Sequence, residues 1–133
     1  MGIPSGSGSE VLRNFAINAN NAATAKVDFG GTTGTGSVRS SGNTAGVVAV
    51  PTNVIITILN ITFNASSNNT NVSATVDWQG SGTDIQIFTS PPVDDNTTIV
   101  YNDMIVLREG DVLKLNTQGQ CDISGCFIYH DFT

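Results

Sequence analysis

Several short stretches of the chain alternate apolar and polar residues with a period of two. Residues 23–29 carry Ala, Val and Phe on one parity and Thr, Lys and Asp on the other. Residues 72–78 set Val, Ala and Trp against Ser, Thr and Asp in the same way. Successive side chains of a β-strand point to opposite faces of the sheet, so this period indicates half-buried strands.

The longest β-branched run, residues 50–64, differs from these stretches. Its first half is apolar on both parities and its second half alternates. One parity carries the apolar residues Ile55 and Leu59, and the other parity is apolar as well. We therefore expect a strand that is covered on both faces at one end. The residues of the other parity, which we expect to form an oligomer interface, are Val54, Ile56 and Ile58.

Turn residues divide the chain into about nine short strands. Gly80-Ser81-Gly82 and Pro91-Pro92, for example, each follow an apolar stretch. Asn, Thr, Ser and Gly supply 56 of the 133 residues, and these residues are poor in helix interiors. The pattern predicts an all-β fold, an antiparallel β-sandwich that is jelly-roll-like.

Two segments fall outside this alternation. Residues 1–10 are mostly Gly, Ser and Pro and predict an extended N-terminal arm, followed by a single sandwich domain over residues 11–133. Residues 30–46 hold six glycines and predict a long Gly/Thr-rich loop, which either closes over a partner or is a surface excursion. The residues that we expect to contact a partner through the arm are Ile3, Pro4, Val11 and Leu12.

The charge pattern narrows the class of partner. Charged residues make up 12% of the chain, and the net charge is −6 with five scattered basic residues. A phosphate backbone requires clustered Lys and Arg, so we expect no nucleic-acid binding. No run approaches the roughly 18 apolar residues of a membrane span, so we expect no membrane association.

The two cysteines, Cys121 and Cys126, bear on the compartment. The opening residues lack the basic flank and apolar core of a secretory signal, which predicts synthesis in a reducing cytoplasm. Free thiols are the default there, although the spacing also allows a small disulfide loop. A zinc site would need further ligands with the right spacing, and the sequence does not supply them.

No group of residues predicts catalysis. His130 is the sole histidine, and the adjacent Asp131 belongs to the opposite face of a strand, so it could not orient the imidazole. The scattered aspartates match no calcium loop, and solvated turn residues are the far commoner explanation of them. We therefore expect a protein that is not an enzyme and that has no catalytic, cofactor-binding or metal-binding residues.

Trp78 is the candidate ligand contact. It precedes the turn Gly80-Ser81-Gly82, where an indole could stack on a sugar ring. Its parity also groups it with Val72, Ala74 and Val76, which favours packing in the core or at a subunit interface.

Two parts of the sequence resemble small structural proteins of tailed bacteriophages, especially marine phages and cyanophages. The first is the opening IPSGSGSEVLR, residues 3–13. The second is the distal half, with VPTN at residues 50–53, IVLREGDVLKL at residues 105–115 and the ending YHDFT. The Gly/Thr-rich loop and the cysteines are not part of the similarity. The resemblance implies a β-sandwich virion protein, often a homotrimer on the capsid shell or neck, and no catalytic residues.

These observations lead to two functional hypotheses. The first is a capsid decoration or cement protein, made in the bacterial host cytoplasm, that binds itself as a homotrimer and the major capsid protein on the outer surface of the virion. The second is a neck, tail or fibre module that binds another virion protein or a host glycan, to which Trp78 would contribute.

Overall fold

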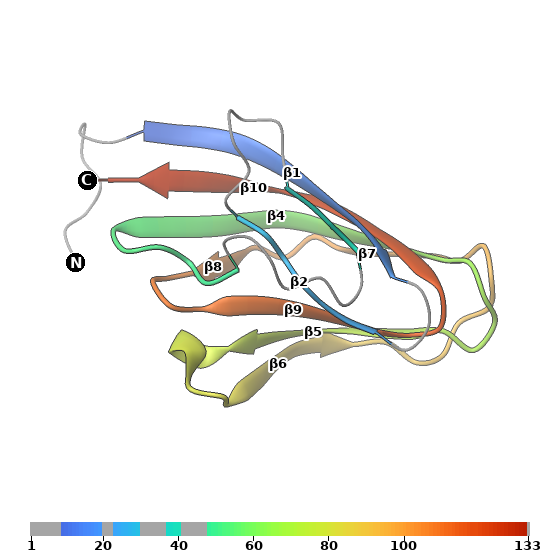
Figure 1. The fold of residues 1–133 in the computed structure, drawn as a ribbon. Helices are drawn as coiled ribbons and strands as arrows, with labels where there is room; N and C mark the ends of the chain where they lie inside the picture. Colours follow the sequence, from blue (N-terminus) through green and yellow to red (C-terminus); the bar gives the residue numbers. More distant parts are fainter. Residues whose placement is uncertain (1–8, 20–22, 30–36, 41–47, 133) are drawn as a thin grey trace.

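The structure is a computed structural model that describes residues 9–19, 23–29, 37–40 and 48–132. Apart from the short 3-10 helix η2 (Trp78–Gly80), the elements in these ranges are strands (Figure 1). In chain order they are β1 (Ser9–Ala19), β2 (Ala23–Lys26), β3 (Ser37–Ser40), β4 (Val54–Ala65), β5 (Asn71–Asp77), β6 (Asp84–Thr89), β7 (Thr98–Tyr101), β8 (Ile105–Leu107), β9 (Val112–Gln118) and β10 (Cys121–Asp131).

The strands form two sheets that pack face to face (Figure 1). Sheet A has the order β3-β1-β10-β4-β7, and β8 also pairs with β4; sheet B has the order β2-β9-β5-β6. If β3 is set aside and β7 and β8 are counted as one strand, the orders become 1-8-3-6 and 2-7-4-5. This is the arrangement of a jelly roll, in which the chain crosses between the sheets in paired Greek keys. The predicted β-sandwich is confirmed.

The core lies between the sheets and follows the alternation in the sequence. In β5 the residues Val72, Ala74 and Val76 are buried, and the residues between them are only partly buried. The rings of Phe29 and Phe127 meet edge to face, with 5.3 Å between their centroids. Inner residues of both sheets therefore interdigitate as in other sandwiches.

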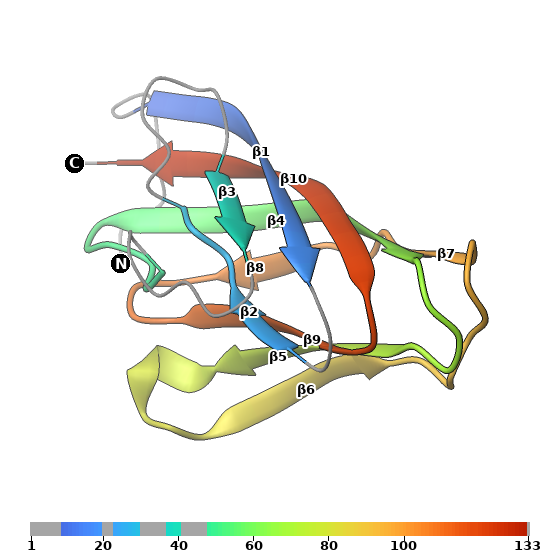
Figure 2. The same cartoon turned by 45° about the vertical axis from the view of Figure 1, so that its right-hand side comes forward.

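One part of the predicted Gly/Thr-rich loop is a strand. Ser37–Ser40 forms β3, which pairs in parallel with β1 and lies beside it at the end of sheet A (Figure 2). The prediction of a continuous loop over residues 30–46 is wrong at this point, because an edge of β1 was available for pairing. Residues 30–36 and 41–47 lie outside the described residues.

The boundary of the predicted arm also changes. Ser9 and Glu10 belong to β1, where they pair with Asp131 and His130 of β10. These two residues form ladder positions of sheet A, so the prediction that the arm extends through residue 10 is wrong. The remaining arm residues, 1–8, lie outside the described residues.

Candidate interaction surface

The outward face of sheet A carries apolar side chains on several strands. Pairing places Leu12 beside Ile128, Ile128 beside Thr57, and Thr57 beside Val106. We call these four residues the apolar row; they cross sheet A from β1 to β8. The exposed fractions of Leu12 and Val106 are 60% and 61%, which are large for aliphatic side chains.

The next two rows along the same face are uncharged. Asn14, Cys126 and Asn60 form the middle row, in which the Asn60 Nδ2 donates a hydrogen bond to the Cys126 Sγ at 3.3 Å. The row after it, which we call the small row, consists of Ala16, Ser124, Thr62 and Val100.

The small side chains leave a depression in this face. It has a volume of about 430 Å³, and Ala16, Thr62 and Ser124 contribute to its lining together with Asp122 and Asn64 of the following row. The outward face of sheet A therefore has raised aliphatic side chains in one row and a hollow two rows away.

The outward face of sheet B is polar by comparison. Lys114 lies at its centre, and its Nζ is 3.0 Å from the Asp84 Oδ1 and 4.0 Å from the Asp77 Oδ2. The Asn116 side chain donates hydrogen bonds to the hydroxyls of Ser73 and Thr75. A face of polar and paired charged side chains is well solvated. Sheet A, whose outward face carries exposed aliphatic side chains, is therefore the surface better suited to a protein partner.

The predicted oligomer interface is not on this surface. Val54, Ile56 and Ile58 point into the core of the single chain, with exposed fractions of 3%, 0% and 0%. The assignment of these residues to an interface is wrong, because sheet B already covers them. The outward residues of the same stretch are Ile55 and Thr57.

A β-bulge explains the mixed parity of this strand. The register of β4 against β10 shifts between Cys126 and Phe127, which leaves Leu59 as an extra residue between Ile58 and Asn60. The inward set therefore changes parity at Leu59 and continues with Ile61. An extra residue reverses the faces of all residues that follow it in the strand.

The predicted arm contacts have separate positions. Val11 and Leu12 belong to β1, with Val11 partly buried opposite Tyr129 and Leu12 on the outward face. Ile3 and Pro4 lie outside the described residues. Leu12 is thus the one predicted arm contact that the structure places on the candidate surface.

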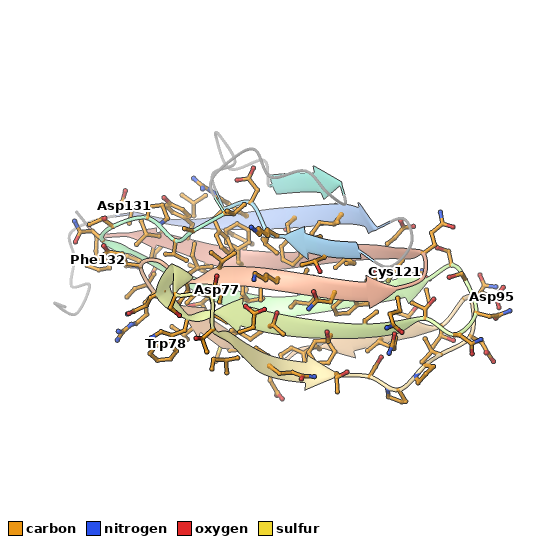
Figure 3. The ribbon with its side chains drawn as sticks, turned by 60° about the horizontal axis from the view of Figure 1, so that its bottom comes forward. Asp77, Trp78, Asp95, Cys121, Asp131 and Phe132 are labelled. Carbon is orange, nitrogen blue, oxygen red and sulfur yellow. The ribbon has the colours of Figure 1, made fainter. Side chains whose placement is uncertain are left out.

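Trp78 lies away from this surface, toward the end of the sandwich that also carries Phe132 (Figure 3). Its exposed fraction is 55%, because β5 ends at Asp77 and the chain turns into η2. The expectation that Trp78 packs with the inward residues of β5 is wrong.

A polar cleft occupies the same end. It has a volume of about 670 Å³, and its lining includes Asn53, Gln79, Arg108, Glu109 and Phe132. Asn53 and Gln79 have φ angles of 60° and 51°, a left-handed conformation that is uncommon for residues other than glycine. Sequence reasoning did not identify this cleft, because its lining comes from turns that are distant in the chain.

Asp111 holds two of these turns together. Its buried carboxylate accepts hydrogen bonds from the backbone N–H of Gln79 and of Arg108, each at 3.0 Å. Hydrogen bonds to a charged acceptor are among the stronger ones in proteins. The shape of the cleft therefore depends on this side chain.

His130 does not form a catalytic group with the residues around it. Its Nδ1 lies 2.7 Å from the Glu10 Oε1 across the β1–β10 pair, and its Nε2 is buried without a hydrogen-bond partner among the residues that the structure describes. A nucleophile activated by this imidazole would have to be within hydrogen-bonding distance of the Nε2. His130 and Glu10 thus form a hydrogen-bonded pair at one end of the outward face of sheet A.

The cysteines are free thiols. Burial raises the pKa of the Cys121 thiol to about 11, and the carboxylate of Asp122 adds to the shift. Cys126 is partly exposed in the middle row.

Within the ranges that the structure describes, no three His, Cys, Asp or Glu side chains come together to hold a metal ion. No helix in these ranges has the length and apolar character needed to cross a membrane.

The similarity of this chain to known proteins is distant. No protein-family model and no curated protein matches the chain. Among solved structures, a chain from the structure of infectious bursal disease virus, Gx strain, matches with a TM-score of 0.37 and 15% identity. The match covers 91% of this chain and 32% of the viral chain, so this chain spans about a third of that chain's length. A similarity this distant does not bear on function.

Proposed function

We propose that this chain is a non-enzymatic structural protein of a phage virion, which binds the outer capsid surface as an oligomer and reinforces the shell. The observation that carries the proposal is the outward face of sheet A, where uncharged rows include the exposed aliphatic side chains Leu12, Val106 and Val100. Exposed apolar surface of this kind is typical of assembly contacts.

Two further observations support the proposal. Jelly rolls are common among viral structural domains, and this chain has the jelly-roll strand order. The opening and distal segments resemble small structural proteins of tailed phages. The resemblance implies a homotrimer. Val54, Ile56 and Ile58, which were expected to form the contact around a threefold axis, lie in the core of the single chain. We therefore propose an oligomer whose subunits do not meet through these three residues.

Counting the chain in purified particles tests this function. Quantitative mass spectrometry of the phage whose genome carries the gene should find hundreds of copies per particle, as expected for a protein spread over the capsid. A dozen or fewer copies would assign the chain to the neck or tail. If the chain is absent from the particles, the virion role is wrong.

Reattachment to the shell tests the reinforcing role. Capsids that lack the chain should bind it when it is added back and should then withstand heating to a higher temperature. Removing residues 1–8 should weaken this attachment while the sandwich stays folded, because β1 begins at Ser9. A truncated chain that binds as tightly as the full chain would show that the arm has no part in attachment.

A second candidate function is a module that binds a glycan, and the polar cleft favours it. Amide and charged side chains beside an aromatic ring, here Asn53, Gln79, Arg108 and Phe132, are the usual lining of sugar sites. A glycan array probed with the full chain and with Trp78→Ala and Arg108→Ala tests this function. Signals that are equal for all three proteins, or absent for all three, would argue against it.

A further inference from the structure

We propose that two copies of this chain associate through the outward faces of their sheets A. A twofold axis would lie between the two faces and run along the middle row. This inference concerns the isolated protein and does not depend on its location in a virion.

The shape of the face supports this axis. A twofold axis along the middle row sets the apolar row of one copy against the small row of the other. Leu12 then lies over Ala16 of the second copy, and Ile128 lies over Ser124. The larger side chains meet the depression of about 430 Å³ that the small row lines. Stacked sheets pack by such interdigitation at a separation of about 10 Å.

Charge also favours this face for contact between identical chains. Each copy carries a net charge of −6, so two copies repel each other wherever their acidic side chains meet. On the described strands, the apolar, middle and small rows contain no charged side chain. The charged residues of this face lie in its two end rows, where the axis places the Glu10–His130 pair of one copy against the row of Asp122 of the other.

The area of the face indicates the size class of the interface. From Glu10 to Asn18 the paired rows extend about 27 Å along β1, and four strands span about 19 Å across the sheet. The product is about 500 Å² for each copy, or about 1,000 Å² in total, which is the lower limit of a specific interface. We therefore expect a reversible dimer whose population rises with protein concentration.

Sedimentation of the full chain over about a hundredfold range of concentration tests the dimer. Ala16→Arg fills the hollow with a charged side chain, and Val106→Lys places a charge at the edge of the apolar row. Each should raise the dissociation constant by about tenfold or more. Gln86→Arg is the matched control, because Gln86 is an exposed residue on the outward face of sheet B. A circular dichroism spectrum shows that each variant is folded.

A thiol cross-link tests the position of the axis. Cys126 belongs to the middle row, so the axis sets it opposite Cys126 of the second copy. A bis-maleimide with a spacer of about 8 Å should then bridge two sheets that are about 10 Å apart. Cys121 is buried with its pKa raised to about 11, so it competes little for the reagent. Cys126→Ser should abolish the cross-link.

Several results would overturn the inference. A chain that stays monomeric at every concentration would refute the interface, and a trimer would refute the twofold symmetry. A dimer that neither Ala16→Arg nor Val106→Lys weakens would place the contact elsewhere. A dimer without the Cys126 cross-link would show that the axis does not follow the middle row.

Discussion

Replacing Gly125 by alanine tests the packing of β1 against β10 with a single methyl group. Gly125 faces the core opposite Phe15, in the part of β10 that pairs with Ile61 of β4. A Cβ at this position would lie 2.5 Å from the Phe15 Cζ and 2.7 Å from its Cε1, and it would also contact the backbone carbonyl oxygen of Asn60. The ring of Phe15 requires glycine at this point.

The cost of the methyl group follows from what would have to move. Real Cβ contacts are essentially never shorter than 3.0 Å, so a neighbouring group must shift. The Phe15 ring is buried and lies 6.3 Å from the Phe127 ring between centroids, and the Asn60 carbonyl belongs to the β4 backbone beside the bulge. Neither is free to move far. Overpacking a rigid core costs about 1–3 kcal/mol, and we expect the upper end of this range.

Equilibrium urea unfolding, followed by circular dichroism at one protein concentration, measures this cost. Ser124→Ala is the matched control, because Ser124 is the exposed neighbour on the outward face and should change stability by no more than about 0.5 kcal/mol. Adding Phe15→Leu to Gly125→Ala should cost less than the sum of the single variants. A change within about 0.5 kcal/mol for Gly125→Ala would show that Phe15 does not lie over residue 125.

Four further predictions concern Ile56, Asp111 and the two cysteines. Ile56→Asp should unfold the chain rather than dissociate an oligomer, and Ile56→Val should cost about 0.5–1.5 kcal/mol in urea unfolding; a folded Asp variant would contradict the core position. Asp111→Ala should cost about 3 kcal/mol, because two backbone N–H groups lose their acceptor, and a neutral result would show that the carboxylate does not hold the turns. Iodoacetamide at pH 8 should modify Cys126 well before Cys121, as peptide mass spectrometry can check. The Cys121 thiol has its pKa raised by folding, so its contribution to stability should be lost as the pH rises from 9.0 to about 11.

The alternation in the sequence predicted which residues of most strands face the core. In β5, and in β9 from Leu113 on, the residues of one parity are buried as the pattern requires. Each strand of a sandwich turns one face toward the core, and successive side chains point to opposite faces. Every second residue is therefore buried, and the alternation of apolar residues identifies it. The prediction failed for β4, where the bulge at Leu59 changes the inward parity within one strand.

Features that depend on pairing between distant segments could not be predicted in this way. β3 contains a single apolar residue, Val38, and is a strand because it pairs with β1. The pair of His130 with Glu10 joins residues that are 120 positions apart. The polar cleft likewise combines turns that are distant in the chain, two of which are held together by Asp111. Local pattern carries no information about which segments meet.

The candidate interaction surface depends on strand register in the same way. β1, β10 and β8 contribute Leu12, Ile128 and Val106 to the apolar row, and isolated surface aliphatic residues are ordinary in soluble proteins. They become a surface only because pairing aligns them across sheet A. A register slip of one residue in β1 would turn Leu12 inward and Phe15 outward. The free energy lost by exposing Phe15 and the other core residues of β1 would be far larger than any free energy gained at the surface. The residues that hold the register, Phe15 over Gly125 above all, therefore also hold the surface together.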